Sequence, residues 1–278
     1  MEESRWLAEG QIQGLWDIGR GRRLQITGSL FDQSYPDSLN RDYQRRRVEI
    51  SFRKTFESRL SLSIHGDTRW LDYRETQRTD EKGWGIRLAG GHPLRWGWHG
   101  EGTFRIGEDR FGRRSLKPRR EPEGDHYEYE LGPDQKDGVR TVGLSLRRLR
   151  PFIFRTGYTL TARSSNSFGF SQIRHEFSML ASLALPWTMD LQILGTLQSA
   201  RYTDSGIDTV YVLRAGEDVE ARDDNNSLTL RLRRPLRDGP IIELRAAWYR
   251  NESLLVGRYY DKWQVGWALR WGLRKEDD

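Results

Sequence analysis

The feature that most constrains this chain is an alternation of apolar and polar side chains, with a period of two, that recurs along its whole length. The segments VEISFR (48–53), LTLRLR (228–233) and IELRAAW (242–248) place apolar residues at every second position. Side chains of a β-strand point alternately to two faces, so this period predicts strands with one apolar and one polar face. No segment shows a sustained helical period, and the sequence therefore predicts an all-β fold.

The alternating segments predict about thirteen strands, most of them ten to fifteen residues long. The expected strands are 5–17, 22–32, 45–54, 58–71, 83–92, 96–107, 138–149, 152–163, 173–185, 188–202, 225–235, 240–251 and 262–273. Strands of soluble proteins usually hold roughly 5–6 residues, whereas a tilted strand that crosses a membrane needs about 9–11. The strand lengths therefore favour a membrane-spanning sheet.

The connections between these strands alternate between short turns and long polar segments. The short connections lie at 19–21, 55–57, 92–94, 150–151, 186–187 and 235–239. The long connections are 33–44, 72–82, 108–137, 164–172, 203–224 and 252–261. Short turns on one rim and long loops on the other are typical of outer-membrane barrels, where the short turns are periplasmic.

Composition agrees with a strand-based membrane protein. Hydrophobic residues make up 36% of the chain and charged residues 31%, and no run approaches the apolar length that a spanning helix needs. The 11 Trp mostly fall near the ends of expected strands, as in the aromatic girdles at membrane interfaces. The chain has no Cys, which excludes disulfides, thiol nucleophiles and thiolate metal sites.

These patterns predict one antiparallel transmembrane β-barrel of about 12–14 strands over residues 1–278. The start, Met1 to Ser4, lacks the features of a secretory signal, so we expect a mature form or the C-terminal part of a longer protein. Thirteen strands is an odd number, and bacterial barrels of one chain have an even number. We therefore expect one more strand before residue 5. The alternative is a strand overlooked near His126 to Leu131.

The last expected strand carries a motif of its own. Gln264, Gly266, Leu269 and Trp271 follow the order polar, glycine, apolar, aromatic, and this resembles the C-terminal insertion signal of bacterial outer-membrane proteins. The resemblance implies recognition by the barrel assembly machinery, although the tail 272–278 departs from it.

A second, local resemblance concerns the segments 249–253 and 259–261. They look like parts of barrels that follow periplasmic tetratricopeptide domains in longer proteins. An absent N-terminal domain of that kind would explain the missing signal.

The polar phase of the strands is rich in arginine. We expect ten arginines to face the lumen as anion-binding residues: Arg23, Arg69, Arg87, Arg105, Arg155, Arg163, Arg174, Arg231, Arg245 and Arg270. Arg53, Arg147 and Arg233 share this phase. The carboxylates expected in it are Glu9, Asp17, Glu49, Asp67, Glu101, Glu176, Asp190 and Glu243. So many charges need water or one another, because an unpaired buried charge costs several kcal/mol.

Two functions fit an arginine-rich lumen. The first is a pore or export conduit for anionic solutes or polysaccharide, because guanidinium groups stay charged and grip carboxylate or phosphate groups. The second is a structural barrel, closed by ion pairs, that anchors a periplasmic or surface complex. Expected partners are outer-membrane lipid and lipopolysaccharide, the barrel assembly machinery, and periplasmic or other outer-membrane proteins.

An outer-membrane hydrolase is the third hypothesis, and we expect no enzyme. The histidines are His65, His92, His99, His126 and His175. None has a Ser nearby in the sequence pattern of an outer-membrane phospholipase. The pairs at 125–126 and 223–224 lie in long loops, as the Asp/His groups of omptin-type proteases do. We expect no metal and no cofactor. The arginines alternate with apolar residues rather than forming one patch, so we expect no nucleic-acid binding either.

Overall fold

The structure is a computed structural model that describes residues 6–34, 42–73, 80–120, 127–203, 223–236, 239–253 and 260–270. Thirteen strands account for nearly all of these residues. They are β1 (Trp6–Gly19), β2 (Arg22–Ser34), β3 (Tyr43–Thr55), β4 (Ser61–Tyr73), β5 (Glu81–Pro93), β6 (Trp98–Arg120), β7 (Tyr127–Arg148), β8 (Ile153–Ser165), β9 (Gln172–Leu185), β10 (Met189–Tyr202), β11 (Asp223–Pro235), β12 (Ile241–Ser253) and β13 (Tyr260–Arg270). A short 3-10 turn, Arg95–Gly97, joins β5 to β6.

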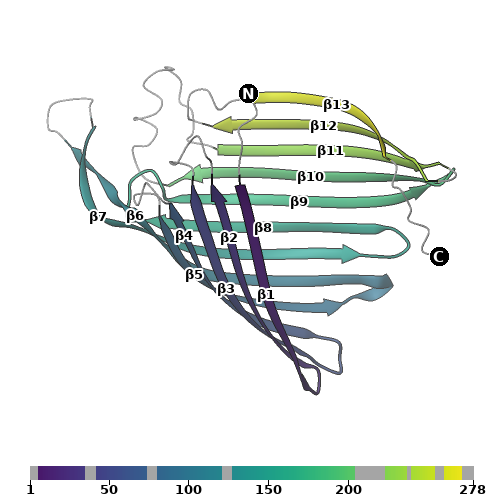
Figure 1. Ribbon diagram of the computed structural model, residues 1–278, viewed down its shortest axis with the longest axis horizontal. Coiled ribbons are helices and arrows are strands. Elements are labelled where there is room, and N and C mark those ends of the chain that lie inside the picture. Colours follow the sequence, from purple (N-terminus) through teal and green to yellow (C-terminus); the bar gives the residue numbers. More distant parts are fainter. Residues whose placement is uncertain are drawn as a thin grey trace.

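The thirteen strands form one sheet in which every strand pairs with its neighbours in sequence. Each pair is antiparallel, from β1–β2 through to β12–β13. Figure 1 shows the sheet as a strongly curved wall, with the short turns at one end of the strands. An up-and-down sheet of this kind is the topology expected for a transmembrane barrel.

The expected strands are confirmed in number and in place. The expected strand 22–32 is β2, and 173–185 is β9, within two residues at each end. One expectation was wrong: most of the expected loop 108–137 is strand, because β6 extends to Arg120 and β7 begins at Tyr127, while 121–126 lie outside the described residues. The sequence of these extensions has charged residues at both odd and even positions. It therefore lacks the alternating apolar residues that identify a membrane-spanning strand. Of the segment in which a strand could have been overlooked, Tyr127 to Leu131 belong to β7 and pair with β6, and residue 126 lies outside the described residues.

The β1–β2 turn shows how tight the short connections are. Gly21 has a φ of 71°, a conformation that side chains rarely adopt. A Cβ atom at Gly21 would lie 2.5 Å from the carbonyl oxygen of Thr55. The Gly21 carbonyl accepts a hydrogen bond of 2.8 Å from the Thr55 N–H, which ties this turn to the end of β3.

The interior of the molecule is polar and its exterior is apolar. Among the described residues, the buried hydrophobic side chains are only Ala181, Ala200 and Ala247. The largest fully buried side chains belong instead to Gln135, Asp42, Asp137, Ser115 and Ser167. Large apolar residues in the middle of strands stay open, such as Ile50, which is 50% exposed. This inversion suits a wall with lipid on the outside and water or ion pairs on the inside.

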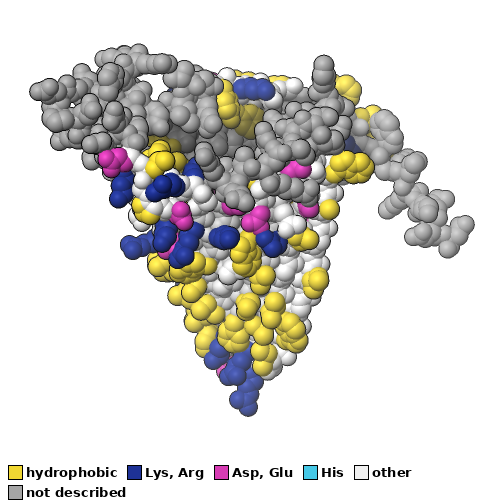
Figure 2. Space-filling model, turned by 60° about the vertical axis from the view of Figure 1, so that its left-hand side comes forward, with side chains coloured by type: hydrophobic (Ala, Val, Ile, Leu, Met, Phe, Trp, Pro, Cys, Tyr) yellow, Lys and Arg dark blue, Asp and Glu magenta, His cyan; other side chains and the backbone are white. Residues whose placement is uncertain are grey.

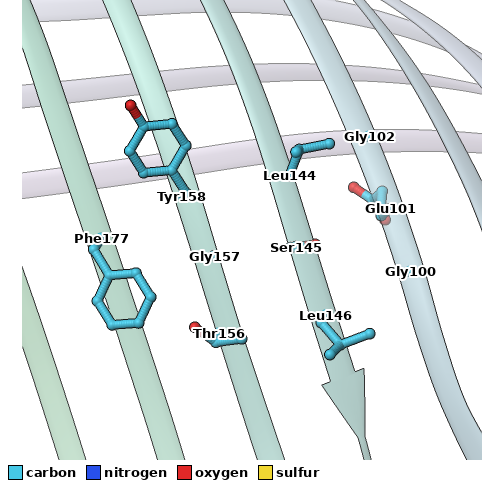
Figure 3. A pocket seen from close by; sticks show the side chains of 10 residues that line it. All are labelled: Gly100, Glu101, Gly102, Leu144, Ser145, Leu146, Thr156, Gly157, Tyr158 and Phe177. Carbon is cyan, nitrogen blue, oxygen red and sulfur yellow. The ribbon is translucent and has the colours of Figure 1, made fainter.

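We call the face with exposed apolar side chains the outer face, and the opposite face the inner face. Leu144 and Leu146 lie on the outer face beside Tyr158 and Phe177, while Ser145 points the other way (Figure 3). Figure 2 shows a band of hydrophobic side chains over part of the outer face, with Lys and Arg at the lower tip and mixed charges above the band.

The tryptophans of the strands share the outer face. The register places there Trp6, Trp16, Trp70, Trp84, Trp98, Trp248, Trp263 and Trp267. They fall toward the two ends of the strands, as an indole at the headgroup level does. The arrangement agrees with the expected aromatic girdles.

The two edge strands, β1 and β13, run in the same direction because the strand number is odd. No ladder joins them within the described residues, and Figure 1 shows their ends near the short turns well apart. The expectation of one further strand before residue 5 stays a prediction. Among the residues that the structure describes, no helix is long and apolar enough to cross a membrane.

Candidate functional site: the arginine-rich inner face

All thirteen arginines expected in the polar phase lie on the inner face. The register shows this directly, because residues opposite each other on neighbouring strands point to the same side. Arg23 lies opposite Arg53, Arg87 opposite Arg105, and Arg147 opposite Arg155. The remaining arginines follow from the same ladders: Arg69, Arg163, Arg174, Arg231, Arg233, Arg245 and Arg270. Whether this face binds anions is a separate question of function.

One group of inner-face arginines is held in ion pairs that cross the fifth strand. Arg69 of β4 contacts Glu81 of β5 at 3.0 Å and reaches over β5 to Asp109 of β6. Arg105 of β6 reaches back over β5 to Asp67 of β4, at 3.1 Å. The Asp109 side chain is only 5% exposed, and that of Asp67 only 9%. Strands β4 and β6 are thus joined although they are not neighbours.

Two glycines make this crossing possible. A Cβ atom at Gly83 would lie 2.5 Å from Asp109 Oδ1 and 3.0 Å from Arg69 Nε. A Cβ atom at Gly85 would lie 2.7 Å from a guanidinium nitrogen of Arg105. Because Gly83 and Gly85 have no side chains, these ion pairs can lie directly against the backbone of β5.

The same group continues onto β7 and β8. Asp137 is completely buried, and its Oδ2 lies 3.6 Å from Arg163 Nη1. Its Oδ1 accepts hydrogen bonds from Ser165 Oγ, at 2.6 Å, and from Gln135 Nε2, at 3.0 Å. We call Arg69, Arg105 and Arg163, with Asp67, Glu81, Asp109 and Asp137, the paired belt.

A second group of ion pairs lies near the short turns of the last strands. Arg233 Nε is 2.9 Å from Asp190 Oδ2. Arg231 and Arg270 both approach Glu243, at 3.2 Å and 3.4 Å. Glu243 is buried, so two guanidinium groups compensate one carboxylate that has little access to water.

A third group has no such compensation. Arg23 and Arg53 lie one or two residues from the short-turn ends of β2 and β3, and Arg147 and Arg155 lie equally near the ends of β7 and β8. All four are exposed, and none forms an ion pair with any described residue, although Asp17 of β1 lies opposite Arg23. We call these four residues the rim arginines. Both pairs lie at the same, short-turn end of the sheet, and His99 of β6 lies opposite Arg147.

Several inner-face charges were missed from the sequence. Glu81, Asp109 and Asp137 fell in segments expected to be connections, and the structure places all three in strands. Arg47 was not singled out, although it lies opposite Arg69 and is 3.0 Å from Glu49. The spacing of 109 and 137 from Arg105 and Thr141 by multiples of two was the signal that could have identified them. The added carboxylates reduce the expected excess of positive charge.

A serine and a histidine also meet on the inner face. Ser63 and His65 are two residues apart on β4, and Ser63 Oγ lies 3.0 Å from His65 Nε2. His65 Nδ1 is buried, makes no hydrogen bond, and lies 3.8 Å from Glu49 Oε1. This order of groups, hydroxyl, imidazole and carboxylate, is the one used for nucleophilic catalysis. Of the two pairs expected in long loops, 125–126 lies outside the described residues, and Asp223 and Asp224 belong to strand β11 instead of a loop.

Most of the proposed assembly signal lies in the edge strand β13. Gln264 and Gly266 are on the inner face and Leu269 is on the outer face, while Trp271 lies outside the described residues. Nothing in this geometry bears on recognition by the assembly machinery, which stays a prediction. Among the described residues, no group of three or more His, Asp or Glu side chains could hold a metal ion.

Comparisons with known proteins give structural neighbours only. No family model matches the chain, and no curated protein matches it. The β domain of the Bordetella autotransporter BrkA aligns over 97% of this chain and 98% of its own, at 10% identity and a TM-score of 0.34. BamA from Haemophilus ducreyi, lacking POTRA domains 1–3, aligns over 97% of this chain and 71% of its own, at 9% identity and a TM-score of 0.35.

The fold itself settles the class of protein. Strands of mostly thirteen or fourteen residues exceed the length of about 9–11 that crosses a bilayer. Their apolar side chains face outward, and their ionisable side chains pair on the inside. A curved sheet with an apolar outer face and a charged inner face fits a lipid bilayer. Its short turns lie on one rim and its long connections on the other. The chain has the fold of a bacterial outer-membrane β-barrel.

Proposed function

We propose that this barrel is a pore or export conduit for anionic solutes, including acidic polysaccharide. The observation that carries the proposal is the placing of arginines directly opposite each other on the inner face. These pairs are Arg23–Arg53, Arg47–Arg69, Arg87–Arg105, Arg147–Arg155 and Arg231–Arg245. Like charges at opposite positions destabilise a sheet. Carboxylates offset this repulsion at Arg47, Arg69, Arg105 and Arg231. The pairs Arg23–Arg53 and Arg147–Arg155 have no ion pair among the described residues, so a passing anion would relieve their repulsion.

Arginine suits this task better than lysine. Its planar guanidinium group stays charged and can bind two oxygens of a carboxylate or phosphate group at once. Two arginines on neighbouring strands offer such a group two guanidinium groups to bind. Rings of basic side chains are known to make pores select anions. Successive pairs at different heights along the wall suit an anion that moves from one to the next.

Planar-bilayer recording tests the proposal. In a gradient of KCl the reversal potential should have the sign of an anion-selective pore. Replacement of the exposed Arg147 and Arg155 by glutamine should move the reversal potential toward zero, because two positive charges leave the inner face. The matched control is Arg148→Gln, since Arg148 lies on the outer face opposite Phe154. Current steps with cation preference, or an absence of steps, would remove the pore hypothesis.

The rival proposal is a structural barrel that anchors other proteins. It is favoured by the paired belt, where Arg69, Arg105 and Arg163 are all compensated. If the barrel is structural, purified protein should give no conductance, and neutralising the rim arginines should leave its complexes in the membrane unchanged. Co-purification from outer membranes, with and without the Arg147→Gln and Arg155→Gln changes, separates the two proposals.

A hydrolase is a second candidate function, favoured by the Ser63–His65–Glu49 arrangement. His65 would accept the proton of the Ser63 hydroxyl as that oxygen attacks an ester carbonyl, and would then donate it to the departing alkoxide. Water would release the acyl group as a carboxylic acid and restore the serine. A fluorophosphonate probe should label Ser63, and the His65→Gln variant should lose the labelling. Labelling that persists in Ser63→Ala, or none in the native protein, would exclude this function.

A further inference from the structure

The compensation of the inner-face arginines differs between the two ends of the strands β2 to β8. Near the short turns, Arg23, Arg53, Arg147 and Arg155 are exposed and make no ion pair with described residues. Farther from the short turns, Arg69, Arg105 and Arg163 each meet a carboxylate, whereas Arg87, opposite Arg105, is exposed and forms no ion pair with described residues. Four inner-face arginines without an ion pair therefore lie near one mouth of this part of the wall.

The exposed fractions follow the same division. The side chains of Arg69, Arg105 and Arg163 are 33%, 32% and 32% exposed, and their carboxylate partners Asp109, Asp67 and Asp137 are 5%, 9% and 0% exposed. An anion that approached these arginines would have to displace a carboxylate that has already lost its water. The rim arginines are exposed and none is held in an ion pair with a described residue, although Asp17 of β1 lies opposite Arg23, so an anion that binds there has no ion pair to break.

We infer that the barrel carries a binding site for multivalent oxyanions at its short-turn mouth, formed by Arg23, Arg53, Arg147 and Arg155, and that anions enter the lumen from this side. This inference rests on the proposed conduit function and adds to it a location and a direction. In an outer-membrane barrel the short turns face the periplasm, so the direction is outward.

The geometry fits an extended anion rather than a single ion. Each of the two Arg–Arg pairs lies on neighbouring strands, where opposite positions are about 5 Å apart at their Cβ atoms. The two pairs come from separate parts of the sheet, β2–β3 and β7–β8, with β4 to β6 between them. Two phosphate or carboxylate groups of one linear molecule could occupy the two pairs at once.

Binding of tripolyphosphate to the purified barrel tests the location. Calorimetric titration should show binding by the native chain, and the double variant Arg147→Gln, Arg155→Gln should bind about tenfold or more weakly, because it loses two charge-assisted contacts. The matched control is Arg233→Gln. Arg233 also lies near a short turn, but Asp190 already compensates it. Equal losses in both variants, or no loss in the double variant, would overturn the inference.

One-sided addition of tripolyphosphate to bilayers tests the direction. The orientation of each inserted barrel can be fixed by a membrane-impermeant thiol reagent on Glu57→Cys in the β3–β4 turn. Block should need about tenfold less tripolyphosphate from the short-turn side, and the double variant should lose this difference. Equal block from both sides would refute the direction of entry.

The two tests also separate the inference from the conduit proposal. An anion-selective current that neither the rim variant nor the side of addition alters would leave the conduit standing and refute the site. Tripolyphosphate binding that depends on Arg147 and Arg155, in a barrel without anion-selective current, would keep the site and refute the conduit.

Discussion

Arg147 of β7 and Arg155 of β8 lie directly opposite each other on the inner face, next to the short β7–β8 turn. Each is exposed, and His99 on the other side of Arg147 adds a third basic group to the row. Replacing Arg147 by glutamine should therefore stabilise the folded barrel by about 0.2–1 kcal/mol, the cost assigned to like charges across a pair of strands. Urea unfolding in lipid vesicles measures this free energy. A loss of stability would mean that Arg147 has a partner on which the wall depends.

The paired belt should respond in the opposite way. Asp109→Asn removes the charge that faces Arg69 where only 5% of the carboxylate side chain is exposed. The remaining contact with Glu81 compensates Arg69 in part, so we expect a loss of about 1–3 kcal/mol in the free energy of unfolding. The control is Glu108→Gln, whose partner Arg110 is exposed, and which should change stability by less than about 1 kcal/mol. Similar losses in both variants would contradict the special role of the buried pair.

Gly83 should tolerate alanine less well than Gly66, a strand glycine with open space around it. Gly83→Ala places a methyl group where Asp109 Oδ1 now lies, and overpacking of this kind costs about 1–3 kcal/mol. Gly66→Ala on the neighbouring strand meets nothing within 4 Å and should be tolerated. In a double-mutant cycle Gly83→Ala and Asp109→Asn should be non-additive, because both act on the same ion pair. Additive losses would show that the alanine disturbs something else.

The edge strands give a prediction about closure. Ile12 of β1 and Val265 of β13 are 83% and 84% exposed, and both strands run the same way. If a further strand lies between them, cysteines at 12 and 265 should not form a disulfide under oxidation in membranes. Cysteines at 26 and 50, which lie opposite each other on β2 and β3, should cross-link and serve as the control. A disulfide between positions 12 and 265 would show that the two edges meet directly.

Strand positions could be predicted from the sequence because lipid imposes a simple rule on each strand. Every second residue must be apolar, so β2, β9 and β12 could be located without knowledge of their neighbours. The rule stops applying where a strand leaves the membrane. The extensions of β6 and β7 beyond Glu108 and Gly138 have no lipid-facing phase, and the sequence there resembles a charged loop.

The inner face could be predicted only in part. Period two assigns Arg69 and Arg105 to it, but does not say which carboxylates they meet. Asp109 is 40 residues from Arg69 in the chain and meets it only through the register of two ladders and the bare backbone of Gly83. The approach of Ser63 to His65 depends likewise on side-chain conformation, which alternation does not fix.

The ion pairs over Gly83 and Gly85 affect how this stretch of wall can grow and come apart. A hairpin of β4 and β5 alone contains Asp67 without Arg105, and Arg69 without Asp109, because both partners arrive with β6. The hairpin therefore contains charged side chains without these partners until β6 pairs with it, although its backbone hydrogen bonds are already made. Peeling β6 away breaks two ion pairs together with one ladder. In this part of the sheet we therefore expect β4, β5 and β6 to assemble, and to open locally, as a unit of three strands rather than as a two-stranded hairpin.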